Sequence, residues 1–339
     1  MRTSDFDYDL PADRIAQHPV EPRDSARLLV DRGTTGIEHR HVRDLDTLLR
    51  EGDLLVVNDT RVIPARLGLH RESGGRVEVL LLEPIDDSSG RTWQALVRPG
   101  GRLRAGELLY DDSERSILQF VGRSSADDTF VVEFATTGDP LALIDEVGEM
   151  PLPPYITERS AEAERYQTVY ARRAASAAAP TAGLHFTPDL LARIEQRGIP
   201  VVRVELVVGL DTFKPVSVED PTEHRMHSEW YSVDQSVLTA ASEARRVVAV
   251  GTTAVRSLES AATTRIRQGR TDLFIRRGYE WKVVDLMMTN FHLPRTTLLM
   301  MIDAFVGGRW RDIYSAALRD DYRFLSFGDA MLLDRHAPS

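Results

Sequence analysis

The sequence VVAVGTT at residues 247–253 decides the fold class, because it joins an apolar run to a glycine and two threonines. Four consecutive apolar residues are typical of a strand that is buried on both faces. The residues that follow, 254–267, have the composition of a helix. A strand that leads directly into a helix is the unit from which α/β sheets are built.

Further stretches extend this alternation of strands and helices. Leu54–Val57 is a second fully apolar run, and the polar residues Asn58–Arg61 follow it. Thr187 precedes Pro188, a pair typical of a helix N-cap and first helical residue. Together these stretches predict a largely parallel or mixed sheet. The expected elements are a strand at 54–57, a helix at 188–198, a strand at 199–208, a helix at 235–246 and a strand at 283–288.

The middle of the chain has a different texture, with short alternating runs separated by turn-rich pieces such as Pro99-Gly100-Gly101. Short, regularly spaced strands predict a small antiparallel barrel or sandwich. We therefore expect a mixed α/β fold in which residues 1–64 and 150–339 form a discontinuous α/β domain. Residues 65–149 form an inserted β-barrel domain. The strands of this insert are expected at 76–82, 93–97, 117–121 and 129–134.

The composition excludes several classes of protein. The 339 residues include no cysteine, which excludes disulfide frameworks, thiolate nucleophiles and cysteine-ligated metal sites. Glycine-rich nucleotide motifs and a nucleophile elbow are also absent from the sequence. The first residues lack the apolar core of a signal peptide, and no apolar run reaches the roughly 18 residues of a membrane helix. We expect a cytoplasmic protein without a membrane partner.

The formal net charge of −10 argues mildly against nucleic-acid binding, since phosphate contacts need cations. The basic residues are nonetheless of the type that recognises phosphate, because Lys214 and Lys282 are the only lysines among 42 basic residues. A local basic surface also matters more than the net charge. Nucleic acid therefore remains open as a partner.

Polar residues follow three of the expected strands directly. They are Asn58–Arg61, Gly251–Thr253 and Asn290–His292. In open α/β sheets the ligand crevice lies outside the carboxyl ends of the strands. We therefore expect these three groups to meet in one polar site.

The start of the helix after Val250 is a candidate anion site. Free backbone N–H groups and the positive end of the helix dipole suit an anion, and Arg256 follows closely enough to add a charge. The alternative interpretation is that Thr252 or Thr253 only caps the helix. An anion site here fits either a phosphate or a carboxylate.

Two other segments carry histidines. Residues 179–186 combine small residues with His185, which suits close approach to a ligand, although a lone histidine beside phenylalanine is more often a packed residue. Residues 224–231 hold two histidines three residues apart and a glutamate, which suggests either a metal site or a proton-handling rim. The H-E-x-x-H order is absent, so we favour a rim in which His227 and Glu229 move protons.

Ten stretches carry a family resemblance, and they are DSARLL (24–29), NDTRVIPAR (58–66), MPLPPYI (150–156), YQTVY (166–170), PTAGLHF (180–186), MHSE (226–229), GTT (251–253), VRSLES (255–260), TNFHLP (289–294) and YRFLSFGDAM (322–331). In this order and at this spacing they strongly resemble the S-adenosylmethionine:tRNA ribosyltransferase-isomerase family. The resemblance spans nearly the whole chain, which chance similarity of single stretches does not explain.

The resemblance implies a tRNA-modifying enzyme with an α/β domain and an inserted β-barrel. S-adenosylmethionine would be consumed as the ribosyl donor, with no metal. The partner would be a tRNA carrying 7-aminomethyl-7-deazaguanine at the wobble position. The implied products are epoxyqueuosine-tRNA, adenine and methionine, in a late step of queuosine synthesis. We expect a monomer or a weak homo-oligomer.

This implied chemistry assigns roles to residues. The positive sulfonium acidifies the adjoining ribose carbon, so a base can remove a proton there, and adenine leaves more easily when its nitrogens are protonated or hydrogen-bonded. The expected catalytic residues are His185, His227, Glu229, His292 and Asp59, with the identity of the base left open. The expected substrate-binding residues are Asn58, Thr60, Arg61, Thr181, Gly183, Gly251, Thr252, Thr253, Arg256, Thr289, Asn290 and Asp329. Of these, Thr252, Thr253 and Arg256 would bind the methionine carboxylate or a tRNA phosphate.

One stretch departs from the family pattern. The family usually has His-Val-Gly-x-Gly-Thr-Phe where this chain has VVGLDTF at 207–213, so Val207 replaces a histidine and Asp211 replaces a glycine. Two alternatives therefore stay open. One is a divergent member that uses another acceptor, such as a free 7-deazaguanine nucleoside. The other is a catalytically inactive RNA-binding protein.

Overall fold

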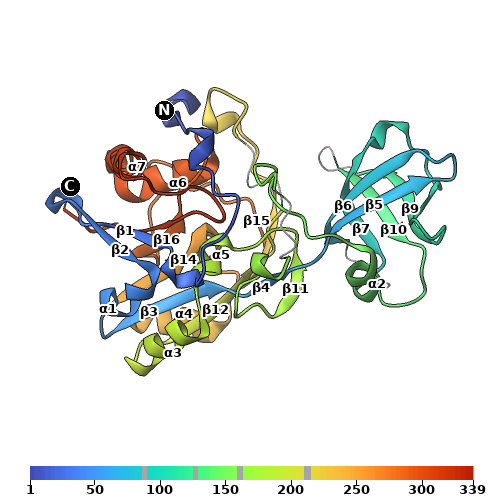
Figure 1. Ribbon diagram of the computed structural model, residues 1–339. Coiled ribbons are helices and arrows are strands. Elements are labelled where there is room, and N and C mark those ends of the chain that lie inside the picture. Colours follow the sequence, from blue (N-terminus) through green and yellow to red (C-terminus); the bar gives the residue numbers. More distant parts are fainter. Residues whose placement is uncertain (86–89, 125–128, 159–162, 210–214, 339) are drawn as a thin grey trace. The chain divides into compact units, whose positions relative to one another are not determined.

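The computed structural model describes residues 1–85, 90–124, 129–158, 163–209 and 215–338, and the chain divides into two compact units (Figure 1). The first unit comprises Met1–Thr60, Pro153–Arg173 and Ala179–Ser339, and the second comprises Arg61–Leu152 and Ala174–Ala178. Asp211, the predicted departure from the family pattern, lies outside the described residues.

The first unit is built on a nine-stranded mixed sheet with the order β15-β13-β12-β3-β14-β16-β17-β1-β2. Its central strands β12, β3, β14 and β16 are parallel neighbours, whereas β17 runs antiparallel to β16. The strands are β1 (Arg27–Asp31), β2 (Ile37–His41), β3 (Asp53–Asn58), β12 (Val201–Leu206), β13 (Glu229–Ser232), β14 (Arg246–Val250), β15 (Gln268–Thr271), β16 (Leu286–Asn290) and β17 (Ala330–Asp334).

Helices cover both faces of this sheet. Leu190 and Ile194 of α3 share a core cluster with Leu55 and Val57 of β3, whereas α5 packs against β3, β12, β14 and β16. All six residues of β3 are consequently buried, as the apolar run predicts. The helices are α1 (Leu45–Leu48), α3 (Pro188–Gln196), α4 (Gln235–Glu243), α5 (Gly251–Thr264), α6 (Thr297–Val306) and α7 (Trp310–Arg319).

Several predicted boundaries move. The predicted N-cap is confirmed, since the Thr187 side chain accepts a hydrogen bond from Leu190 N. Helix α4 ends three residues early, because Arg246 already belongs to β14 and donates to the buried Asp53 carboxylate of β3 at 2.6 and 2.8 Å. Strand β16 begins at Leu286 and includes two polar residues at its end. The longest helix, α5, has 14 residues, and none of the helices in the described ranges is long and apolar enough to cross a membrane.

The second unit contains a closed antiparallel barrel with the strand order β10-β7-β6-β5-β8-β9. This confirms the predicted fold class, a mixed α/β protein with an inserted β-barrel. The exact extent of the two domains remains a prediction. The elements are β5 (Arg66–Arg71), β6 (Arg76–Pro84), β7 (Thr92–Arg98), β8 (Leu108–Tyr110), β9 (Ser116–Arg123), β10 (Phe130–Phe134) and α2 (Pro140–Val147), while β4 (Thr60–Val62) pairs with β11 (Arg173–Ser176).

Candidate active site

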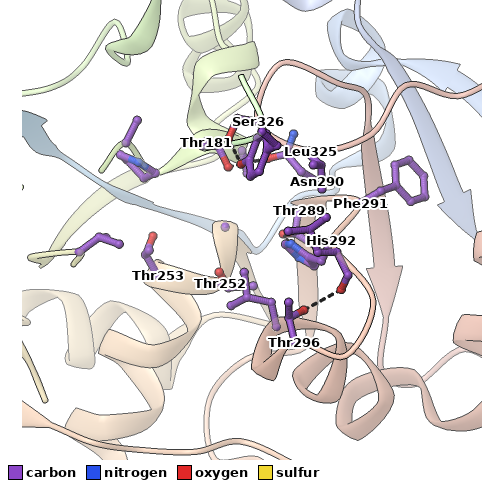
Figure 2. A pocket seen from close by; sticks show the side chains of 18 residues that line it. Thr181, Thr252, Thr253, Thr289, Asn290, Phe291, His292, Thr296, Leu325 and Ser326 are labelled. Atoms are coloured by element: carbon purple, nitrogen blue, oxygen red, sulfur yellow. Dashed lines mark hydrogen bonds between the residues drawn. The ribbon is translucent and has the colours of Figure 1, made fainter. Parts of the chain in front are cut away.

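A pocket of about 590 Å³, partly open to solvent, lies at the carboxyl ends of β14 and β16 in the first unit (Figure 2). Hydroxyl, amide and imidazole groups line it together with leucine and valine side chains, and its 18 described lining residues include no Asp, Glu, Lys or Arg. Seven predicted site residues line the pocket, namely Thr181, Gly251, Thr252, Thr253, Thr289, Asn290 and His292.

Helix α5 begins at the edge of this pocket. Its first residue, Gly251, has a φ of +85°, a conformation that favours glycine. The N-cap Val250 makes no side-chain capping bond, so the first N–H groups of the helix lack intrahelical partners. Thr252 and Thr253 lie inside the first turn, which excludes the alternative that either is the N-cap. The buried Oγ1 of Thr253 has no hydrogen-bond partner among the described residues. This arrangement suits an anion.

The side chain of Asn290 is the centre of a hydrogen-bonded group at the end of β16. Its Oδ1 accepts from Thr181 Oγ1 at 2.9 Å, and its Nδ2 donates to His185 Nε2 at 3.1 Å. The same Nδ2 also approaches the backbone oxygen of Asp329 at 3.3 Å. His185 thus lies one hydrogen bond behind the pocket and holds the amide that lines it.

His292 and His185 are both neutral imidazoles. Burial lowers the pKa of His292 to about 3, and burial together with the Arg323 and Arg23 charges lowers the pKa of His185 to about 3. His292 lines the pocket, and its Nε2 lies 3.1 Å from Thr289 Oγ1. At neutral pH neither ring carries the extra proton of a general acid, so each ring can accept a hydrogen bond.

The polar residues at the end of β3 bond to the protein itself. Asn58 is fully buried; its Nδ2 donates to the Leu206 oxygen at 3.0 Å, and its Oδ1 accepts from Leu206 N at 3.2 Å. Thr60 Oγ1 donates to the same Leu206 oxygen at 3.3 Å. Asp59 is 6% exposed, and burial followed by the nearby Glu205 raises its pKa. None of these three predicted site residues lines the pocket.

Glu229 and Arg256 form a buried ion pair, with 6% and 5% of their side chains exposed. Arg256 Nη1 donates to Glu229 Oε2, while Glu229 Oε1 accepts from Gly209 N at 3.2 Å. The charge of Arg256 is therefore neutralised by Glu229, and neither residue lines the pocket. The structure thus places both residues outside the pocket lining, and their predicted roles in anion binding and proton transfer stay predictions.

The remaining predicted site residues lie outside the pocket lining. His227 is exposed on the segment before β13, and Arg61 is exposed in the second unit. Gly183 is a close-approach position, since a Cβ there would lie 2.1 Å from Tyr170 Oη. The Asp329 carboxylate accepts two backbone N–H groups at 2.8 and 2.9 Å. In the described ranges no three His, Cys, Asp or Glu side chains are placed to hold a metal ion.

Sequence reasoning missed three hydroxyls of the pocket wall, those of Tyr155, Thr296 and Ser326. Tyr155 Oη and Ser326 Oγ are 2.6 Å apart, and both residues line the pocket. Ser326 lies in the loop before β17, whose first residue, Ala330, pairs with Asn290 at the end of the antiparallel β16. An antiparallel strand delivers its preceding loop to the edge where its neighbour ends. That direction is the signal that could have identified Ser326.

Comparisons with known proteins agree along the whole chain. The family described as "Queuosine biosynthesis protein" matches residues 3–333. Proteins named "S-adenosylmethionine:tRNA ribosyltransferase-isomerase" from Symbiobacterium thermophilum and Moorella thermoacetica are each 50% identical to this chain, and the matches cover 98% of this chain and 100% of either relative. The crystal structure of S-adenosylmethionine tRNA ribosyltransferase from Thermotoga maritima is 38% identical, with a TM-score of 0.54, and the match covers 96% of this chain and 99% of that one. The chain belongs to the queuosine biosynthesis protein family.

Proposed function

We propose that this chain transfers and isomerises the ribosyl moiety of S-adenosylmethionine onto tRNA, with 7-aminomethyl-7-deazaguanine at the wobble position as the acceptor and the cytoplasm as the location. Full-length relatives carry the name of this reaction. The proposal rests on which parts of the sequence supply the pocket residues. Five separate stretches that carry the family resemblance, 150–156, 180–186, 251–253, 289–294 and 322–331, all contribute to one pocket.

The start of α5 binds the methionine carboxylate in this proposal. The lining residues carry no formal positive charge, so the helix dipole and the free N–H groups of the first turn supply the attraction. The unpartnered hydroxyl of Thr253 adds a donor beside them. A carboxylate suits the first turn of α5 better than a tRNA phosphate. Thr252 and Thr253 are only 7% and 8% exposed, so they accommodate a small group.

The other lining groups fit the nucleoside. Asn290 is fixed by Thr181 and His185, so its Oδ1 presents a rigid acceptor to a ribose hydroxyl or a base edge. Leu293 and Leu325 supply apolar surface for the adenine ring. Tyr155 and Ser326 add hydroxyls on the same wall.

His292 is the general base in this proposal. It lines the pocket, whereas His185 lies behind Asn290 and His227 is exposed. The neutral ring accepts the proton from the ribose carbon next to the sulfonium, and the carboxylate bound at α5 stabilises the imidazolium that forms. Ring opening expels adenine, the amine of the modified base forms the new bond to the activated carbon, and closure of the epoxide releases methionine.

Mass spectrometry of precursor tRNA after incubation with the protein and S-adenosylmethionine tests the proposal. The expected result is a mass increase on the tRNA that corresponds to the added ribosyl-derived group, with adenine and methionine released in equal amounts. Unchanged tRNA together with product on the free 7-deazaguanine nucleoside would support the divergent acceptor. Tight binding of the tRNA without any adenine release would support an inactive RNA-binding protein.

A further inference from the structure

Two phenols bond to the two backbone polar groups of His292. The His292 N–H donates to Tyr314 Oη at 3.0 Å, and Tyr8 Oη donates to the His292 carbonyl oxygen. The ring itself is bonded through Nε2 to Thr289. Both backbone polar groups and one ring nitrogen of this residue are thus fixed, although it lies in a loop after β16.

The two phenols come from distant parts of the first unit. Tyr314 lies in α7, and Tyr8 follows a short 3₁₀ turn at Thr3–Phe6. This N-terminal segment is tied to the same loop, because Arg295 N donates to the Phe6 oxygen at 2.9 Å. The Tyr8 and Tyr314 rings also pack edge to face at 5.2 Å. Burial raises the pKa of both phenols, so both stay protonated, and Tyr8 keeps the proton that it donates to the His292 carbonyl oxygen.

We infer that Tyr8 and Tyr314 are positioning residues that set the place of His292 in the pocket. This inference rests on the role of His292 in the proposed function. A catalytic group must be held within about 0.5 Å of its productive position, and a misplacement of about 1 Å can cost roughly a hundredfold in rate. Neither phenol lines the pocket. Their effect on the reaction therefore passes through His292.

Tyr8→Phe and Tyr314→Phe remove one hydroxyl each and keep the ring packing. The matched control is Tyr322→Phe. Tyr322 packs on the Phe291 ring at 5.6 Å, as Tyr314 does at 5.5 Å, but its hydroxyl bonds to His39. We expect kcat for adenine release to fall about tenfold in both test variants, with KM for S-adenosylmethionine within about twofold of wild type. The control variant should keep its kcat, and thermal unfolding should show all three variants folded.

Double variants that include His292→Ala distinguish an effect on the position of His292 from a general effect on protein stability. Groups that act through one another lose additivity, so Tyr8→Phe added to His292→Ala should lower the residual rate less than about twofold. A further tenfold loss in that background would overturn the inference. So would kcat values within about twofold of wild type for both Tyr8→Phe and Tyr314→Phe while His292→Ala is strongly impaired. If His292→Ala itself stays within about threefold of wild type, the catalytic role in the proposed function fails first.

Discussion

Strands β3 and β14 are parallel neighbours in the sheet, and polar residues follow both of them at the same edge. After β14, Thr252 and Thr253 line the pocket, and one of their hydroxyls has no partner in the described protein. At the end of β3, Asn58 and Thr60 bond instead to the backbone of Leu206. Both pairs of residues lie at the same edge of the sheet, but one pair lines the pocket and the other bonds to the backbone.

The direction of a strand therefore determines where a polar group at its end lies. The hydrogen-bond partners of that group determine whether it is free to bind a ligand. A buried polar group that is satisfied inside the protein contributes to folding, and removing it leaves its partners unpaired. A helix start next to a pocket has N–H groups that the helix cannot satisfy. The proposed function therefore uses the end of β14 for binding, whereas the side chains at the end of β3 join β3 to β12.

The largest effect is expected at the pocket. His292→Ala should lower kcat for adenine release by about 10²–10⁴-fold, since general bases usually contribute that much. Some loss of melting temperature should accompany this, because the ring is buried and its Nε2 is bonded to Thr289. Steady-state kinetics and thermal unfolding check both parts. A rate within about threefold of wild type would remove His292 from the reaction.

Asn58→Ala should reverse this pattern. Two backbone groups of Leu206 lose a buried partner, which should lower the free energy of unfolding by about 2–4 kcal/mol. The fraction that remains folded should keep nearly the wild-type kcat, because Asn58 does not line the pocket. Urea unfolding and active-site-normalised kinetics test this. A large loss of kcat in a stable variant would contradict the division between the two strand ends.

Thr253→Val tests the proposed carboxylate site at the start of α5. The valine keeps the shape and removes a hydroxyl that has no partner in the described protein, so the free energy of unfolding should change by less than about 0.5 kcal/mol. KM for S-adenosylmethionine should rise about tenfold, the value of one hydrogen bond to a charged group. Thr263→Val, in the last turn of the same helix, is the control and should leave KM unchanged. Equal KM values for both variants would exclude the carboxylate site.

The smallest effect concerns pH. His185 and His292 have pKa values of about 3 in the folded protein, below the ordinary value near 6.5 of an unfolded chain. As the pH falls below about 6.5, the unfolded state gains protons that the folded state does not, so stability falls toward acid pH. Each ring should contribute a slope of about 1.4 kcal/mol per pH unit in that window. Urea unfolding at pH 7.5, 6.0 and 5.0 should give a shallower dependence in His292→Asn than in wild type, and identical slopes would contradict the buried neutral ring.

Much of the fold follows from local patterns. The apolar runs of β3 and β14 and the Thr187 cap were predictable, because burial on two faces and helix capping leave direct marks in composition. Four of the six barrel strands were also predicted, whereas β5 and β8 were missed. Arg246 was assigned to the preceding helix, since its partner Asp53 lies far away in the chain. The end of β16 was set too early because its last two residues, Thr289 and Asn290, are polar. Both are buried, because the side chain of Thr289 bonds to His292 and that of Asn290 bonds to Thr181.

The site was predictable where strand direction alone decides it, as for Thr252, Asn290 and His292. It was not predictable for Glu229 and Arg256, which are 27 positions apart and become partners only when β13 packs beside α5. Each is a charged residue of a type that often takes part in catalysis or ligand binding. A charge buried with its counter-ion mainly supports the structure, and only the coordinates reveal that pairing.

The most direct measurement is the crystal structure of this chain with S-adenosylmethionine bound. We expect the methionine carboxylate at the first turn of α5, beside Thr252 and Thr253. The ribose should lie next to Asn290, and the carbon adjacent to the sulfonium should face His292. A ligand bound instead beside Asn58 and Asp59, or at the exposed His227, would contradict this expectation.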